Sequence, residues 1–390
     1  VLFVLLLSIA GCSSMDSVVA GSQSASDTQD AVVTQVPTVT LPGATVADLL
    51  DGASPAIDQG IATPTVTALP TSTVAASPTP TSVPFEVGRE ITIDYLRGLE
   101  ISGSEITFEQ KLDKTWNYHQ HLVSYVSEGN KIYGLLTVPV GDPPPGGFKA
   151  IVFNHGYIPP ANYRTTERYT AYVDYLARSG FVVFKIDYRG HGNSEGQASG
   201  TYFSPGYTID AIAALKSLQK LDFVDPDGIG MWGHSMAGNL VLRSMLIEPD
   251  IRAGVIWAGA VYSYDDFARY GIDDNTYRPP AAQENQPESD RPRRSRQIID
   301  TYGMPDARVE YWQEVSLTGN IAHLTSPVQL HHAEDDPVVN IGYSFDLAAV
   351  LRENSKQYEF FSYESGGHNL VSPYFDQAMQ RTVEFFRSHL

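Results

Sequence analysis

The segment Gly233-His-Ser-Met-Ala-Gly238 places a serine among small residues. It directly follows the apolar run 228–232, which we expect to be a strand, and it leads into 236–247, which has helical periodicity. A sharp turn from strand to helix of this kind raises a serine hydroxyl clear of a sheet, and its strained, crowded backbone favours small residues. Ala237 stands at the position of the second glycine, and its methyl group is only a small intrusion. The sequence therefore predicts that Ser235 is a nucleophile.

An alcohol becomes a nucleophile when a base takes its proton, and the base needs an acid to fix its tautomer. Proteins with such a turn have the chain order Ser, acid, His. The histidines that follow Ser235 are His323, His331, His332, His368 and His389. His368 comes just after the predicted strand 357–361, in Glu364-Ser-Gly-Gly-His-Asn369, where two glycines allow a close approach. We therefore predict that His368 is the base.

The acid should follow the strand before the last helix-strand unit, and Glu334-Asp335-Asp336 stands at that place. Asp336 precedes Pro337, so its backbone is biased toward an extended or turn conformation. Asp335 and Glu334 are more typical of turn and surface acids, and they stay open as alternatives. We predict that Asp336 is the acid.

Acyl transfer also requires N–H donors for the oxyanion. One is expected from the residue after the nucleophile, Met236, and another from the loop after the predicted strand 150–153. That loop reads Asn154-His-Gly-Tyr-Ile-Pro-Pro160, and its glycine allows the backbone to turn its amides inward. We predict the backbone N–H groups of Tyr157 and Met236 as the two donors, each worth about 2.7–4 kcal/mol. His155 is expected to be structural.

Short apolar runs alternate with segments of helical periodicity along most of the chain. The predicted strands are 118–126, 131–139, 150–153, 181–186, 228–232, 253–257, 328–330 and 357–361, and the predicted helices are 165–179, 207–220, 236–247, 342–354 and 373–389. The first two strands should pair antiparallel around Glu128-Gly-Asn130.

The later strands are apolar without alternation, which indicates an α/β fold with a mostly parallel central sheet and helices on both faces. Functional groups gather at the carboxyl ends of such strands. Residues 262–326 are polar and rich in turns, and we expect them to form an insertion or lid that shapes specificity.

Five motifs carry a family resemblance: His155-Gly156, Asp187-Tyr-Arg-Gly-His-Gly-Asn-Ser-Glu-Gly196, Gly233-His-Ser-Met-Ala-Gly238, Asp336-Pro-Val-Val339 and Gly366-Gly-His368. In this order they make residues 116–390 resemble α/β hydrolases of the prolyl oligopeptidase and dienelactone hydrolase-like branch. Asp225-Pro-Asp-Gly-Ile-Gly-Met-Trp-Gly-His-Ser235 is especially similar to the catalytic domain of the prolyl oligopeptidase group. The resemblance implies the α/β-hydrolase fold and a Ser-Asp-His triad. The loop 187–196 is expected to shape the site without doing chemistry.

The first ten residues are an apolar run about half the length that a membrane-spanning helix needs, which is typical of a signal-peptide core. Ile9-Ala10-Gly11-Cys12 follows and resembles the lipobox of bacterial lipoproteins, whose cysteine is acylated after the leader is cut. From residue 13 to 84 the chain is rich in Ser and Thr, has eight prolines and lacks aromatic residues. Such a composition indicates a disordered stalk. We predict a signal peptide at 1–11, a stalk at 12–86 and a catalytic domain at 87–390, in an exported lipoprotein anchored to a membrane through lipid on Cys12.

The chain has 26 Lys and Arg against 45 Asp and Glu, a net charge of −19, which argues against nucleic acid as a partner. Seven of the acids, and no Lys, Arg or His, lie in residues 1–88. No phosphate-binding glycine loop and no Cys/His zinc spacing occurs in the sequence, so neither a cofactor nor a metal is expected. The partners we expect are a small-molecule or peptide acyl substrate and the membrane.

A Ser-His-Asp triad hydrolyses esters and peptides by the same steps, so the triad alone does not choose between them. The resemblance favours peptides, but the predicted stalk leaves no room for the β-propeller that selects short peptides in prolyl oligopeptidases. We therefore expect a serine hydrolase that cleaves carboxylic esters, with an exopeptidase as the alternative. A non-catalytic surface binding lipoprotein is the alternative from another class.

Overall fold

The computed structural model describes residues 86–112, 115, 117–272 and 290–390. A division of the chain between Pro78 and Thr79 puts all of these residues in one unit. The predicted signal peptide, Cys12 and the stalk up to residue 85 lie outside the described residues. In the described part, no helix combines the length and the apolar character that a membrane span requires.

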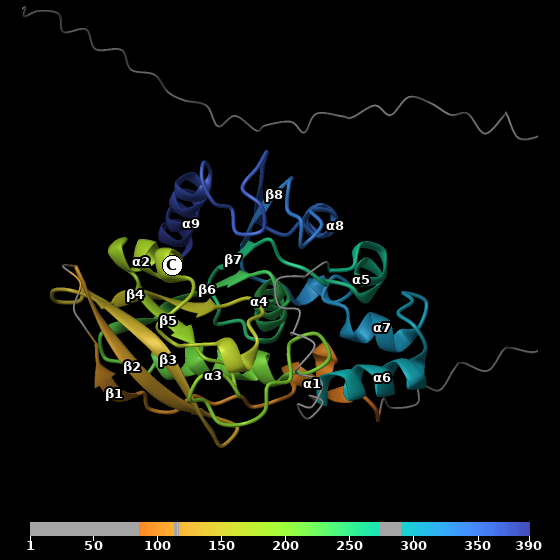
Figure 1. Cartoon of the computed structure of the whole chain (residues 1–390), viewed down its shortest axis with the longest axis horizontal. Coiled ribbons are helices and arrows are strands. Elements are labelled where there is room, and N and C mark those ends of the chain that lie inside the picture. The colour runs from red at the N-terminus through yellow and green to blue at the C-terminus, as the bar shows by residue number, and fades with distance from the viewer. Residues whose placement is uncertain (1–85, 113–114, 116, 273–289) are drawn as a thin grey trace, which may run out of the picture. The chain divides into compact units, whose positions relative to one another are not determined.

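A nine-stranded sheet forms the centre of this unit, with the order β1-β2-β3-β5-β4-β6-β7-β8-β9 (Figure 1). The strands β1, β2 and β3 pair antiparallel, β3 also pairs antiparallel with β5, and the remaining pairs are parallel. The predicted α/β class with a mostly parallel sheet is thereby confirmed. The strand bounds are Thr107–Lys111, Tyr118–Ser127, Asn130–Pro139, Phe148–Asn154, Val182–Ile186, Val224–His234, Gly254–Trp257, Val328–Ala333 and Tyr358–Tyr363 for β1 to β9.

The central strands are apolar throughout because both of their faces are covered. In β4, Ile151 and Phe153 join one core with residues of α2 and α9, whereas Ala150 and Val152 join another with α3, α4 and α8. All four side chains are fully buried. Alternate side chains of a strand point to opposite faces, so one apolar run supplies both cores.

Five of the α-helices in the described residues, α2, α3, α4, α8 and α9, lie where the sequence predicted helices, with one correction, and the other four were not predicted. The bounds of the helices are Ile93–Arg97, Thr170–Arg178, Gly206–Leu218, Met236–Ile247, Tyr264–Tyr270, Asp290–Tyr302, Glu310–Val315, Gly342–Glu353 and Phe375–His389 for α1 to α9. The helix predicted from residue 165 begins only at Thr170. Arg168 and Tyr169 both have a φ of 54°, which a right-handed helix excludes, so 165–169 is a loop.

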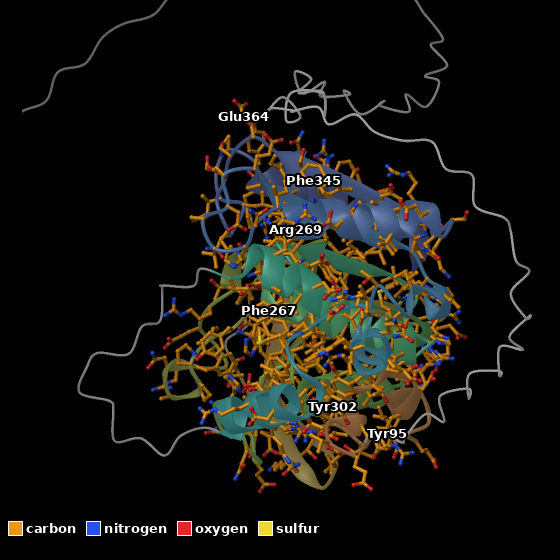
Figure 2. The ribbon with its side chains drawn as sticks, turned by 90° about the vertical axis from the view of Figure 1, so that its right-hand side faces the viewer. Tyr95, Phe267, Arg269, Tyr302, Phe345 and Glu364 are labelled. Atoms are coloured by element: carbon orange, nitrogen blue, oxygen red, sulfur yellow. The ribbon has the colours of Figure 1, made fainter. Side chains whose placement is uncertain are left out.

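The described residues of 262–326 pack against the segment that precedes β1. Helices α5, α6 and α7 of 262–326 supply Tyr264, Ile298 and Tyr311 to a third buried cluster that also contains Ile91. The hydroxyl of Tyr302 donates to the carbonyl oxygen of Val87 at 2.8 Å. Figure 2 shows Tyr302 on the same side of the molecule as Tyr95 of α1.

Candidate active site

Ser235 lies at the junction of β6 and α4, with a φ of 57° and a ψ of −122°. Such a backbone costs a non-glycine residue about 1–3 kcal/mol and is held by its surroundings. The Ser235 N–H donates to the carbonyl of Trp257 at 2.9 Å, and its own carbonyl accepts from the Gly238 N–H at 2.8 Å. A Cβ at Gly233 would lie 2.6 Å from the carbonyl oxygen of Ala237, so only glycine fits there. The turn thus has the strand-to-helix geometry expected from the motif.

His368 follows β9 and turns toward the loop after β8. Its Nδ1 lies 2.8 Å from Oδ2 of Asp336, and because a carboxylate oxygen accepts, Nδ1 is the donor. In the neutral imidazole the other ring nitrogen, Nε2, is then the unprotonated one. A histidine in this tautomer is ready to take a proton from a hydroxyl group.

The carboxylate of Asp336 is enclosed, with its side chain 1 % exposed. Its Oδ1 accepts the backbone N–H groups of Val338 at 2.8 Å and Val339 at 3.0 Å. Burial raises the pKa of this carboxyl, but the hydrogen bonds from His332 and His368 outweigh burial and hold the pKa well below its usual value. Asp336 is therefore ionised at neutral pH.

His332 braces the same carboxylate from within the sheet. Its Nε2 lies 3.2 Å from Oδ2 of Asp336 and 3.0 Å from the carbonyl oxygen of Val339. Both oxygens accept, so Nε2 carries a proton, and in the neutral ring Nδ1 accepts from the hydroxyl of Ser344 at 2.7 Å. From the sequence, His332 was only one of the five histidines that follow Ser235, and its contact with Asp336 was not predicted.

The two alternative acids lie elsewhere. Asp335 is exposed, and its Oδ1 accepts the backbone N–H of Gly367 at 2.8 Å, so it shapes the turn before His368. Glu334 is exposed as well, and its backbone N–H donates to the carbonyl of Tyr363. Of the three adjacent acids, Asp336 is the one whose side chain meets His368.

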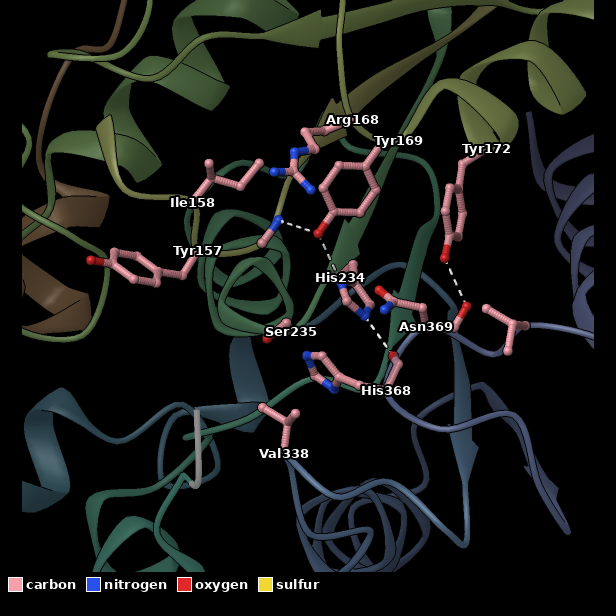
Figure 3. A pocket seen from close by; sticks show the side chains of 12 residues that line it. Tyr157, Ile158, Arg168, Tyr169, Tyr172, His234, Ser235, Val338, His368 and Asn369 are labelled. Carbon is pink, nitrogen blue, oxygen red and sulfur yellow. Dashed lines mark hydrogen bonds between the residues drawn. The ribbon is translucent and has the colours of Figure 1, made fainter. Parts of the chain in front are cut away.

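Ser235 and His368 open onto one pocket of about 400 Å³ (Figure 3). The residues that line it are Gly156, Tyr157, Ile158, Arg168, Tyr169, Tyr172, His234, Ser235, Val338, His368, Asn369 and Val371. The segment 262–326 was expected to shape specificity, but none of its described residues lines this pocket. Apart from Ser235, His368 and Arg168, the lining residues are aromatic, aliphatic or otherwise without a formal charge.

The two segments that carry the predicted oxyanion donors lie next to Ser235. Met236 is the first residue of α4, where backbone N–H groups have no partner within the helix. A Cβ at Gly156 would lie 3.2 Å from Cβ of Ser235, so the loop after β4 passes directly beside Ser235. The Gly156 N–H donates to the hydroxyl of Tyr169 at 3.0 Å, so Gly156 itself is engaged, and Tyr157 stays the predicted donor of this loop.

A hydrogen-bonded chain joins the loop after β4, the end of β6 and the loop after β9, and no local pattern in the sequence indicated it. The Nε2 of His234 lies 2.7 Å from the carbonyl oxygen of His368, so Nε2 is the donor. Nδ1 of His234 must then accept, and it does so from the hydroxyl of Tyr169 at 2.8 Å. Burial lowers the pKa of His234 to about 3, which keeps the ring neutral and this order of donors intact.

His155 and Asp187 sit behind the pocket rather than in it. His155 is fully buried, stacks on Tyr163 with ring centroids 4.5 Å apart, and has its pKa held well below the usual value by burial. Asp187 accepts hydrogen bonds from the hydroxyls of Tyr163 and Thr165. Burial raises the pKa of Asp187 to about 6. Neither residue lines the pocket, as expected for structural positions.

Among the described residues, no group of three or more His, Cys, Asp or Glu side chains is arranged to hold a metal ion.

Two family models match parts of the chain. One, described as serine aminopeptidase, S33, matches residues 148–273, and the other, described as BAAT / acyl-CoA thioester hydrolase C terminal, matches residues 211–390. The uncharacterized peptidase YtmA of Bacillus subtilis is 25% identical over 252 residues, which are 64% of this chain and 85% of that protein. Protein ABHD12B of Homo sapiens is 24% identical over 229 residues, 58% of this chain and 57% of its own.

Solved structures with similar folds include esterases and peptidases. Acetyl xylan esterase 1 from Thermoanaerobacterium sp. JW/SL YS485 superposes with a TM-score of 0.51 at 18% identity, over 75% of this chain and 90% of that one. Dipeptidyl peptidase 4 of Porphyromonas gingivalis has a TM-score of 0.51 at 17% identity, over 70% of this chain and 36% of that one. At these identities the similarity shows the fold.

The fold is therefore that of the α/β hydrolases. Within this class, the hydrolase family models make the protein a serine hydrolase enzyme.

Proposed function

We propose that the protein hydrolyses carboxylic esters at Ser235 through an acyl-enzyme. The observation that carries the proposal is that Ser235 and His368 line one pocket of about 400 Å³. In it, His368 is hydrogen-bonded to Asp336 at 2.8 Å. This volume suits a small acyl or alcohol group.

The reaction follows from the tautomer of His368. Its Nε2 takes the proton of the Ser235 hydroxyl while the oxygen attacks the carbonyl carbon of the ester, and Asp336 stabilises the imidazolium that forms. The backbone N–H groups of Met236 and Tyr157 hold the oxyanion. The imidazolium then protonates the leaving alcohol, and His368 activates a water molecule that releases the acid from Ser235.

The charge of the pocket favours esters over peptides cleaved from their N-terminus. An aminopeptidase must bind the α-ammonium group of its substrate, for which a carboxylate is the natural partner. None of the described lining residues has a carboxylate side chain, and the one that has a permanent charge, Arg168, is cationic. Such a lining does not attract an ammonium group.

Peptide hydrolysis is the second candidate function. It is favoured by the family model described as serine aminopeptidase and by the peptidase YtmA, which this chain matches over 85% of that protein's length. It would use the same triad.

One assay separates the two candidates. We would measure turnover of p-nitrophenyl esters of increasing acyl length beside aminoacyl-p-nitroanilides, with Ser235→Ala as the control. The proposal requires ester turnover that is lost in Ser235→Ala. Turnover of anilides with negligible turnover of esters would make the protein a peptidase, and loss of neither activity in Ser235→Ala would remove Ser235 from the mechanism.

We also propose that the enzyme is an exported lipoprotein held at a membrane by acylated Cys12. The support is the segment Ile9-Ala10-Gly11-Cys12 after an apolar run, and the Ser/Thr/Pro-rich stretch that follows would act as a tether. Cells expressing the full gene should incorporate a labelled fatty acid into the wild-type protein and not into Cys12→Ala. Release of both proteins into the soluble fraction would contradict the anchor.

A further inference from the structure

Arg168 is the only permanently charged residue among the described residues that line the pocket. Its side chain is exposed, and Figure 3 shows it beside Ile158 and Tyr169 at the wall across from His368. Within the described part of the chain, its guanidinium takes part in no hydrogen bond or ion pair. A guanidinium has five N–H donors in a planar fork that matches a carboxylate.

The backbone of Arg168 is held in an unusual conformation. Arg168 and Tyr169 both have a φ of 54°, which costs free energy for residues other than glycine. The ammonium group of Lys185 in β5 lies beneath them and donates to the carbonyl oxygens of Glu167 at 2.8 Å and Arg168 at 3.2 Å. Lys185 is 1% exposed, so a buried ammonium group stabilises the backbone of the loop 165–169.

Tyr169, the next residue of the loop 165–169, is hydrogen-bonded to residues next to Ser235. The hydroxyl of Tyr169 bonds to both the Gly156 N–H and Nδ1 of His234, the neighbour of the nucleophile. Hydrogen bonds from Lys185 on one side and from Tyr169 on the other therefore fix the backbone of Arg168 relative to Ser235. The side chain of Arg168 can still turn toward a ligand.

Nearby carboxylates do not neutralise Arg168. Asp174, which follows in α2, is engaged by the hydroxyl of Tyr118 at 2.8 Å and by Arg178 at 2.7 Å. Asp336 is enclosed behind His368. The adjacent Glu167 is exposed to solvent. The guanidinium thus faces the pocket without an ion-pair partner among the described residues, in a protein of net charge −19.

We propose that Arg168 binds a carboxylate on the substrate, so that the enzyme prefers esters whose acyl or alcohol part carries a negative charge. This inference rests on the proposed function and names its substrate class. An ion pair between guanidinium and carboxylate adds binding that a neutral ester of the same shape lacks.

The test compares substrates that differ in charge and match in shape. For the acyl part, the pair is the p-nitrophenyl hemiester of succinate and p-nitrophenyl 4-methylpentanoate. For the alcohol part, the pair is 4-acetoxybenzoate and its methyl ester. In each pair we would measure the ratio of kcat/KM for the anionic and the neutral ester, in the wild type and in Arg168→Gln, Arg168→Lys and Arg178→Gln.

We expect at least one ratio to exceed 1 in the wild type and to fall about 10-fold to 100-fold in Arg168→Gln. The neutral esters should keep their kcat/KM within about threefold, Arg168→Lys should retain part of the ratio, and sodium chloride should reduce it. Arg178→Gln removes the same charge from an exposed ion pair of the same region and should leave both ratios unchanged. Ratios that do not change in Arg168→Gln would overturn the proposal.

Binding without turnover separates this proposal from the proposed function. In the Ser235→Ala background, calorimetry with monoethyl succinate should show binding that Arg168→Gln weakens about 10-fold or more. If esters are hydrolysed but neither this binding nor the ratios depend on Arg168, only the role of Arg168 fails. If no ester is hydrolysed and binding still depends on Arg168, esterase activity fails and the carboxylate site stands.

Discussion

The Nδ1 atom of His368 donates a hydrogen bond of 2.8 Å to Oδ2 of Asp336. The neighbouring carboxylate of Asp335 also accepts a hydrogen bond of 2.8 Å, but from the backbone of Gly367. Two adjacent acids thus support the same loop in different ways, one through the imidazole and the other through the main chain.

This difference separates the effects of two matched substitutions. Asp336→Asn keeps the size of the side chain but removes the charge that orients His368, so we expect kcat to fall about 10³-fold to 10⁴-fold with the fold intact. Asp335→Asn keeps an oxygen that can accept from Gly367, and kcat should stay within about tenfold. Ester turnover and circular dichroism of both variants check this. A larger loss in Asp335→Asn would assign the acid to Asp335.

Stability at acid pH should also depend on Asp336. The pKa of Asp336 is lower in the folded protein than in the unfolded chain, where it is about 3.9. The ionised carboxylate therefore stabilises the fold. This contribution is fully present above the unfolded pKa and is lost as the pH falls toward the folded pKa. Between about pH 5 and pH 2, the wild type should lose about 2 kcal/mol more of its free energy of unfolding than Asp336→Asn loses. Urea unfolding at several pH values measures this, and equal slopes would show that the carboxylate is not stabilised by folding.

The hydrogen-bonded chain from Gly156 through Tyr169 and His234 to His368 should contribute to the rate of turnover. Tyr169→Phe removes the hydroxyl that serves two of these groups, so we expect kcat to fall on the order of tenfold, with a loss of about 1–3 kcal/mol in the free energy of unfolding. Tyr175→Phe, in the adjacent helix α2 and outside these hydrogen bonds, is the control.

A purely structural role for Tyr169 gives a different result. In that case Tyr169→Phe would lower the melting temperature but leave kcat and the rate of inactivation by a fluorophosphonate unchanged.

The oxyanion loop depends on the absence of a side chain at Gly156. A Cβ there would lie 2.7 Å from the hydroxyl oxygen of Tyr169 and 3.2 Å from Cβ of Ser235, so Gly156→Ala must displace the loop. Loss of one oxyanion donor corresponds to about a 10²-fold to 10³-fold fall in kcat. Gly98→Ala adds a methyl group 3.4 Å from its nearest neighbour, far along the chain, and should leave kcat unchanged. If Gly156→Ala retains full kcat, the loop does not supply a donor.

The positions of Ser235, Asp336 and His368 could be predicted because each follows a strand whose apolar run is visible in the sequence. Parallel strands bring the loops at their carboxyl ends to one edge, so chain order alone indicates that these loops meet. The same reasoning located β4 to β9 within a few residues, apart from the longer start of β6.

Other features leave no local signal. The hydrogen bond between Tyr169 and His234 joins residues 65 positions apart, and Tyr169 lies in a loop that helical periodicity assigned to a helix. All five residues of β1 are exposed, so Thr107–Lys111 lacks the alternation that marks a strand. The helix α1 has only five residues, too few for a periodic pattern. In each case contacts made by distant segments outweigh local preference.

The central claim is that Ser235 is the nucleophile and that His368 and Asp336 activate it. The most direct measurement is mass spectrometry of the protein after reaction with a fluorophosphonate, followed by mapping of the modified peptide. We expect one adduct, on Ser235, that is absent in Ser235→Ala and forms at least 100-fold more slowly in Asp336→Asn. An adduct on another residue, or ester turnover that survives in Ser235→Ala, would contradict the account.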